Sequence, residues 1–141
     1  MAEAISEARR GSTEGESAVG AVAVLDDAMI ARDHHRTAAS GDPTAHAALL
    51  TVRAAARRLE TRRLAEVTVF VTHEPCAMCV GALLEAEVGV LVYAVRDPAR
   101  GCAGSAVDLA RQPSLPHQLS VISGVREGEA QRLDIGSTAP V

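Results

Sequence analysis

The feature that most limits the possible folds is a β-branched segment that runs directly into a helix start. Residues 67–72 (VTVFVT) are β-branched almost throughout, which is typical of a strand buried in the centre of a sheet. Pro75 follows three residues later, and proline is favoured in the first turn of a helix. This unit therefore predicts a central strand that leads into a helix.

The rest of the chain alternates between strand and helix patterns. We expect strands at 19–25, 28–32, 67–72, 88–95 and 119–122, with a turn at Asp26-Asp27. We expect helices at 2–10 (ended by Gly11), 45–59, 75–86, 105–111 and 125–133. This alternation predicts one layered α/β domain over residues 1–133, followed by a frayed tail at 134–141.

Composition narrows the class of protein. The chain has 141 residues, of which 48% are hydrophobic, but only one Tyr, one Phe and no Trp, so the core must be aliphatic. No apolar run approaches the roughly 18–20 residues of a membrane helix. The first residues are acidic and lack the layout of a secretory signal, so we expect a cytoplasmic protein without a membrane partner.

The charge balance disfavours a nucleic-acid partner. All 14 basic residues are Arg, and 18 acidic residues bring the net charge to −4. Proteins that bind a nucleic-acid backbone usually have a basic surface, and readers of single-stranded RNA use aromatic side chains for stacking. A local basic patch could still lie within a negative total.

Two cysteines indicate a metal site. Cys76 and Cys79 lie at i and i+3 at a helix start, where the helix dipole favours thiolates, and a His46 at another helix start offers a third ligand. Three protein ligands leave one position for water, as in a catalytic zinc site. A redox pair or two buried thiols are the alternatives for an isolated Cys-x-x-Cys. Cys102 is expected to be a small buried side chain.

These residues and their surroundings resemble the zinc-dependent cytidine and deoxycytidylate deaminase superfamily, in particular its bacterial tRNA adenosine deaminase and nucleobase deaminase branch. The matching segments are 19–22, 42–47, 71–79 and 96–105. The resemblance implies a three-layer α-β-α fold around a mixed sheet of about five strands, and a homodimer. It also implies one zinc ion per chain, held by His46, Cys76 and Cys79, that activates water for hydrolytic deamination.

Ala48 departs from the family pattern at its most important position. The family motif has a glutamate two residues after the histidine, and that glutamate transfers protons between water, ring and leaving amine. An alanine methyl group can do none of this. Either the substitution is engineered, or the chain is a natural pseudoenzyme that binds without turnover. Glu74, a scaffold residue in the family motif, is a weak candidate for a replacement base.

The substrate pocket is expected to be formed by Val19, His35, Ala47 and the backbone at Pro75. His35 stands where the family usually has an asparagine, and it could equally be an exposed loop residue. His34, His73 and His117 are expected at the surface or beside the site, not as ligands. A solvated helix face is the expectation for the arginines at 53, 57, 58, 62 and 63.

Together these features predict a zinc aminohydrolase that acts on a free nucleobase, a nucleoside or a related aminated heterocycle. The present sequence would be impaired by Ala48. Wobble adenosine deamination in tRNA is the alternative within the enzyme class, although the chain lacks the basic character and the aromatic C-terminal helix of those enzymes. A non-catalytic binding protein is the alternative from another class.

Overall fold

The structure is a computed structural model, and it describes residues 1–133. The helices and strands, in chain order, are α1 (Ala2–Thr13), β1 (Gly20–Leu25), β2 (Ala28–His34), α2 (Thr37–Ser40), α3 (Ala47–Leu59), β3 (Thr68–His73), α4 (Ala77–Glu85), β4 (Val90–Val95), β5 (Ser120–Ser123) and α5 (Glu127–Gln131). The predicted frayed tail, 134–141, lies outside the described residues.

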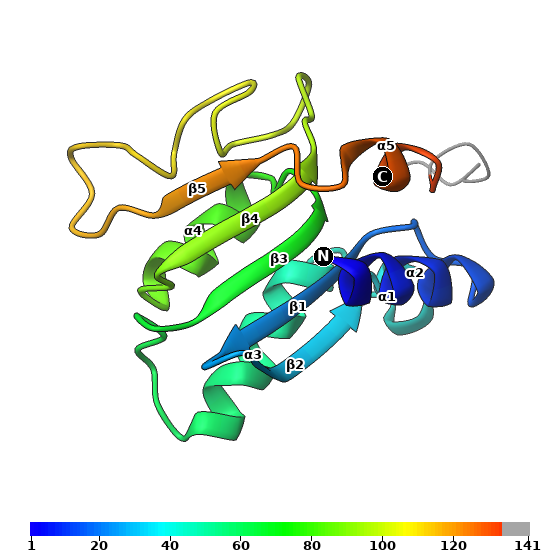
Figure 1. Ribbon diagram of the computed structural model, residues 1–141, viewed down its shortest axis with the longest axis horizontal. Coiled ribbons are helices and arrows are strands. Elements are labelled where there is room, and N and C mark those ends of the chain that lie inside the picture. Colours follow the sequence, from blue (N-terminus) through cyan, green and yellow to red (C-terminus); the bar gives the residue numbers. More distant parts are fainter. Residues whose placement is uncertain (134–141) are drawn as a thin grey trace.

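A five-stranded mixed sheet forms the middle of the molecule, in the order β2-β1-β3-β4-β5 (Figure 1). β1 is antiparallel to both β2 and β3, whereas β4 is parallel to β3 and to β5. The tight turn between β1 and β2 uses Asp26 and Asp27, both at positive φ (48° and 61°). The predicted layered α/β fold is confirmed.

Helices α3 and α4 cover one face of the sheet and bury the main core (Figure 1). The core is aliphatic, as expected, with Val69, Val71 and Leu91 from the sheet packed against Val80 and Leu83 from α4. Tyr93, 1% exposed, is the aromatic residue in this cluster. Both helices begin at the same edge of the sheet, which brings their first turns together.

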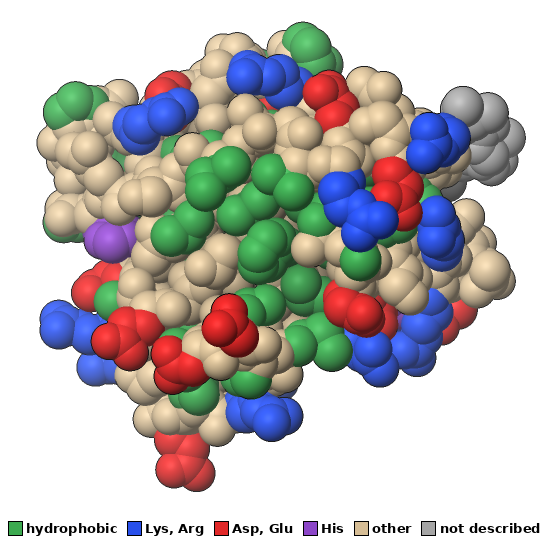
Figure 2. Space-filling view, viewed as in Figure 1, with side chains coloured by type: hydrophobic (Ala, Val, Ile, Leu, Met, Phe, Trp, Pro, Cys, Tyr) green, Lys and Arg blue, Asp and Glu red, His purple; other side chains and the backbone are tan. Residues whose placement is uncertain are grey.

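Helices α1 and α5 lie on the other face, towards one end (Figure 1). Ile5 of α1 and Ala130 of α5 pack against Ala94 of β4. Gly20 allows α1 to approach β1, because a Cβ there would lie 2.2 Å from the Ala4 carbonyl oxygen. Figure 2 shows an apolar patch in the middle of this face. The cross-strand neighbours Val22, Phe70, Val92 and Ile122 lie on this side of the sheet.

Three local predictions were wrong. Gly11 does not end the first helix, because its lack of a side chain lets the helix pass close to His34: a Cβ at Gly11 would lie 2.8 Å from His34 Cδ2. Residues 105–111 form turns and an isolated bridge between Ala103 and Asp108 instead of a helix. The expected loop at 34–44 contains the short helix α2.

Within residues 1–133, no helix has the length and apolar character needed to cross a membrane.

Candidate metal centre and active site

The topology collects several loops at one edge of the sheet. β2, β3 and β4 run in the same direction, so their carboxyl ends lie at the same edge, and β1 begins there. The segments that follow these ends carry His35, Glu74 and Asp97. In α/β sheets this edge is the usual place for a binding site.

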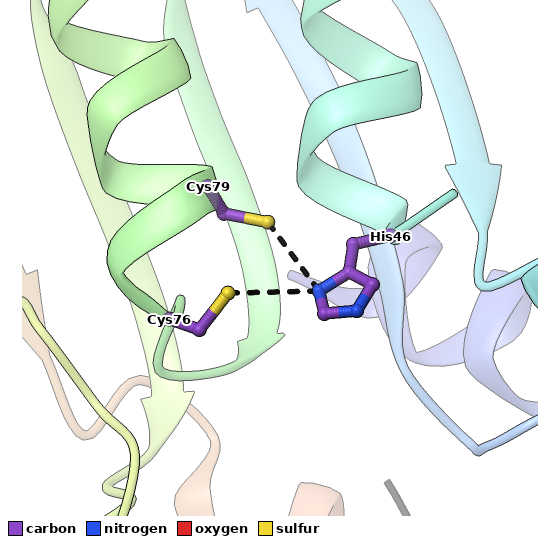
Figure 3. Close-up of side chains that lie close together, drawn as sticks. All are labelled: His46, Cys76 and Cys79. Atoms are coloured by element: carbon purple, nitrogen blue, oxygen red, sulfur yellow. Dashed lines mark hydrogen bonds between the residues drawn. The ribbon is translucent and has the colours of Figure 1, made fainter. Parts of the chain in front are cut away.

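His46, Cys76 and Cys79 converge at this edge (Figure 3). His46 is the N-cap residue of α3 and Cys76 that of α4, and Cys79 lies one turn further along α4. The Nδ1 atom of His46 is 3.6 Å from the Sγ atom of each cysteine. All three ligand atoms lie within 4.8 Å of one another. The structure therefore brings together the three predicted metal ligands.

The spacing of these atoms fits a tetrahedral zinc ion. With Zn–S and Zn–N bonds of about 2.3 and 2.0–2.1 Å, a nitrogen and a sulfur on one tetrahedral zinc lie about 3.6 Å apart. The observed His46–Cys76 and His46–Cys79 separations match that value.

The two thiols interact with each other, and their pKa values are shifted in opposite directions. A hydrogen bond from the Cys79 thiol lowers the pKa of Cys76 to about 4, and the charge of His46 acts in the same direction. The pKa of Cys79 is raised, first because its proton is held by Cys76 and then because the side chain is buried. Cys76 is thus a ready thiolate, whereas Cys79 must lose its proton when a metal binds.

His35 lies against the metal ligands as a neutral ring. It stacks on His46, with the ring centroids 4.5 Å apart and the planes 23° from parallel. Its Nδ1 atom accepts a hydrogen bond from the Ala47 backbone N–H at 3.2 Å. Burial, and then the charge of His46, lower the pKa of His35 to about 3. A neutral imidazole that accepts at Nδ1 carries its proton on Nε2, so His35 can act there as a donor.

A cavity of about 390 Å³ opens beside these residues. His46, Cys76 and Cys79 line it, and so do Val19, His35, Ala48 and Pro75. Ala47 does not line it: this residue is fully buried and contributes its N–H to His35. The predicted pocket residues therefore surround one space, except for Ala47.

One wall of the cavity was not anticipated as such. Asp97, Pro98 and Arg100 line the cavity from the loop that follows β4. The sequence predicts this segment only as a loop that resembles the family pattern. The loop lies beside the Cys76 helix because β4, which precedes the loop, pairs in parallel with β3, which precedes the helix. Sequence periodicity does not reveal which strands are neighbours, so this position could not be predicted.

Glu74 has no capacity left for acid–base chemistry. Its carboxylate accepts hydrogen bonds from the backbone N–H groups of Asp97, Ala103 and Ser105, and from the Ser105 hydroxyl. These four bonds use the lone pairs of both oxygens. The geometry therefore opposes the replacement-base hypothesis for this residue.

The other histidines lie in three different settings. His34 was expected at the surface or beside the site, but it is fully buried between Glu7 and Glu14, at 3.1 and 2.9 Å from its two ring nitrogens. His73 is half-buried and lines the cavity. His117 is half-buried and its Nε2 lies 3.1 Å from the Val88 carbonyl oxygen. Cys102 is buried, as predicted.

Comparison with known proteins gives a consistent family assignment. Residues 1–95 match the sequence profile of the cytidine and deoxycytidylate deaminase zinc-binding region. The tRNA-specific adenosine deaminase of Bacillus subtilis is 40% identical over 129 residues, which cover 92% of this chain and 80% of that protein. The tRNA-specific adenosine deaminase of Agrobacterium fabrum is 38% identical over 130 residues, covering 92% and 86%.

Solved structures agree with the sequence comparison. A structure from a study of A-to-I editing by tRNA wobble-position deaminases superposes with a TM-score of 0.88 at 38% identity, covering 92% of this chain and 94% of the other. The guanine deaminase of Nitrosomonas europaea superposes with a TM-score of 0.76 at 21% identity, covering 94% and 79%. At that identity the likeness to the guanine deaminase is evidence for the fold alone.

These comparisons contradict the prediction of a free nucleobase or nucleoside as the substrate. The Bacillus and Agrobacterium relatives, at 40% and 38% identity, are tRNA-specific adenosine deaminases, and the solved structure at 38% identity comes from a study of tRNA deaminases. The prediction was wrong because it used the net charge of the whole chain, which says nothing about where the charges lie. Arg96 and Arg100, for example, both line the cavity.

Proposed function

The chain belongs to the cytidine and deoxycytidylate deaminase zinc-binding family, and from this premise we propose that it is a tRNA adenosine deaminase, converting adenosine to inosine, whose turnover is impaired by Ala48. The observation that carries the proposal is the His46–Cys76–Cys79 cluster in the wall of a cavity that also contains Ala48. The similarity to tRNA adenosine deaminases over more than 90% of the chain supports the substrate class.

The cluster would hold one zinc ion per chain through His46 Nδ1 and the two cysteine sulfurs. Zinc bound there supplies a Lewis acid that lowers the pKa of a water molecule towards neutrality. Cys76 is prepared for this role by its lowered pKa. All three ligands lie at the N-terminal ends of helices: His46 and Cys76 are N-cap residues, and Cys79 is in the first turn of α4.

The remaining cavity residues would bind and orient the adenine ring. Val19 and Pro75 offer apolar surface to a planar ring. His35 offers a donor at Nε2, since its Nδ1 atom is held by the Ala47 N–H. An imidazole donor can pair only with an acceptor on the ring edge, whereas the asparagine of related enzymes offers both a donor and an acceptor.

Ala48 explains why we expect substrate binding without efficient turnover. It is nearly buried, at 3% exposure, and it lines the cavity in the first turn of α3. Deamination needs a group that takes a proton from water and delivers protons to the ring and the leaving amine. Glu74 cannot supply it, because loop hydrogen bonds occupy its oxygens.

The first prediction concerns the metal. Protein purified without chelator should contain about one zinc per chain by elemental analysis. Replacing Cys79 with Ser should abolish stoichiometric zinc, because it removes a ligand with little change in volume, whereas Cys102→Ser should retain it. A disulfide between Cys76 and Cys79 in metal-free protein would overturn this assignment.

The second prediction restores the missing proton-transfer group. Ala48→Glu should raise inosine formation in an anticodon stem-loop by about 10²–10⁴-fold over the present chain, since removal of a general acid–base group typically costs that much. Ala48→Gln is the matched control, because it has nearly the same shape but transfers no protons. Rapid turnover by the present chain, equal to that of Ala48→Glu, would show that another group is the base.

A non-catalytic binding protein is the second candidate, and Ala48 itself is the observation that favours it. It would bind the stem-loop as tightly as Ala48→Glu does, and Ala48→Glu would not turn over.

The expected homodimer stays a prediction. Val80, Leu83 and Leu84, which could have served an interface, are buried in the core of one chain.

A further inference from the structure

The loop that follows β4 has little regular structure, yet it forms part of the cavity wall. Residues 97–105 lie between β4 and β5 and belong to no helix or named strand. Asp97, Pro98 and Arg100 from this loop line the cavity beside the metal ligands. A loop without a hydrogen-bonding ladder of its own needs contacts from elsewhere to keep one shape.

Glu74 supplies four such contacts, in addition to the turn bonds that Asp97 makes within the loop. Its Oε2 atom accepts from the Asp97 N–H at 3.0 Å and from the Ser105 hydroxyl. Its Oε1 atom accepts from the N–H groups of Ala103 and Ser105, each at 3.0 Å. Glu74 is 5% exposed, so these bonds are protected from water. One buried carboxylate thus binds the beginning and the end of the loop.

The loop is shaped around this carboxylate. A Cβ at Gly101 would lie 2.4 Å from the Glu74 Cδ atom and 2.6 Å from the Asp97 carbonyl oxygen, so this position accepts only glycine without a backbone shift. The Cys102 N–H donates to the Pro75 carbonyl oxygen at 2.9 Å. The loop is therefore fixed against the residues that immediately precede the metal ligand Cys76.

We propose that Glu74 is a positioning residue that holds loop 97–105 as a wall of the substrate cavity and thereby sets the affinity for the RNA substrate. This inference rests on the proposed function. Glu74 acts through the loop and not on the reacting atoms, because all its acceptor sites are occupied. Glu74 lies between the end of β3 and Pro75, two residues before the metal ligand Cys76. Its side chain therefore fixes the position of the loop relative to the metal site.

Glu74→Gln in the present chain is the main test. The amide keeps one acceptor oxygen but turns an NH₂ group towards backbone N–H donors, so at least one loop bond is lost. We expect the Kd for an anticodon stem-loop, measured by fluorescence anisotropy, to rise about tenfold. Hydrogen exchange at the amides of Asp97, Ala103 and Ser105 should become faster, while zinc content stays at one per chain.

Ser105→Ala is a milder second variant. It removes only the hydroxyl donor and leaves the three backbone bonds to Glu74, so it should fold even if Glu74→Gln does not. We expect a rise in Kd of about threefold. The fold-rise in Kd of the double variant should be smaller than the product of the two single fold-rises, because both substitutions act on one hydrogen-bond network.

Thr51→Val is the matched control. It removes another buried hydroxyl, which donates to the Ala21 carbonyl oxygen at 3.3 Å and does not line the cavity. Its Kd should equal that of the parent even though its thermal stability falls. If the role of Glu74 were purely structural, Glu74→Gln and Ser105→Ala would likewise lower the thermal stability and leave the Kd unchanged.

Faster amide exchange in Glu74→Gln with an unchanged Kd would overturn the proposal. Loss of zinc from this variant would also overturn it, because Glu74 would then act by positioning the metal ligand Cys76. Failure of the parent chain and of Ala48→Glu to bind or convert the stem-loop would instead refute the proposed function. Amide exchange needs no substrate, so unchanged protection at the three amides would still refute the hold on the loop.

Discussion

His35 shows how a single position can be chemically defined by its neighbours. Its ring lies against His46, and the Ala47 N–H occupies its Nδ1 atom. Burial, and then the neighbouring His46 ring, lower the pKa of His35, so His35 stays neutral. A neutral, buried histidine has a direct consequence for the pH dependence of folding.

The third prediction follows from the pKa of His35, which is lowered from 6.5 to about 3. Below about pH 6.5 the unfolded chain binds a proton at this ring and the folded chain does not. The contribution of His35 to stability is therefore complete above that pH, and it is lost progressively as the pH falls towards 3. The slope can reach about 1.4 kcal/mol per pH unit.

The measurement is the free energy of unfolding in urea at about pH 7 and about pH 5, for the parent and for His35→Asn. The parent should lose more stability between the two values, because asparagine does not titrate. If both proteins lost the same free energy of unfolding between the two pH values, the pKa of His35 would be the same in the folded and unfolded states, and the prediction would be wrong.

At this scale, the sequence indicated the identity of site residues better than their chemical state. His46, Cys76 and Cys79 could be predicted because helix geometry makes an i, i+3 pair at a helix start converge. The burial of His34 could not be predicted, because its partners Glu7 and Glu14 belong to a helix that packs there only in the folded chain. The four bonds of Glu74 depend on a loop more than twenty residues away.

At the scale of helices and strands, a polar contact joins α1 to the end of β2, in addition to the apolar packing of Ile5. His34 at the end of β2 lies with its two ring nitrogens against Glu7 and Glu14, and Glu7 also pairs with Arg32 at 3.2 Å. The hydrogen bond from His34 lowers the pKa of Glu14. The close contact at Gly11 permits this arrangement.

The fourth prediction is that His34→Ala will weaken the packing of α1 against β2 and lower the free energy of unfolding. The change leaves a cavity and deprives the buried Glu7 carboxylate of one partner, two effects that together typically cost about 2–4 kcal/mol. His117→Ala is the control, because His117 is half-buried with a contact to a backbone carbonyl, and it should cost less than about 1 kcal/mol. Equal losses of unfolding free energy in urea would contradict the role of His34.

The predicted strands agree with the observed ones to within about two residues, because each is a short apolar run bounded by turn or loop residues. The helix expected at 105–111 failed for a tertiary reason. The Ser105 N–H and hydroxyl are both used by Glu74, and the Ala106 and Val107 N–H groups donate to the Gly101 carbonyl oxygen. These bonds replace the start of a helix.

At the scale of the whole molecule, the acidic total and the proposed RNA substrate must be reconciled. The net charge of −4 is a sum over the surface, and long-range attraction of RNA by such a protein should be weak. Arg96 and Arg100 line the cavity, so phosphate contacts can be confined to its mouth. Binding would then depend on a few local contacts and on the shape of the cavity.

The fifth prediction tests this distribution through the salt dependence of stem-loop binding. For single strands, log Kobs falls with log salt with a slope of about −0.7 per phosphate contact, so two contacts give about −1.4. Arg100→Gln should reduce that slope by about 0.7, whereas Arg57→Gln, on the exposed side of α3, should leave it unchanged. Anisotropy titrations at several salt concentrations give all three slopes. A much steeper slope in the parent, reduced by Arg57→Gln, would place the RNA backbone along α3 instead of at the cavity mouth. The affinity would then depend on a basic helix face and not on the loop wall that Glu74 holds.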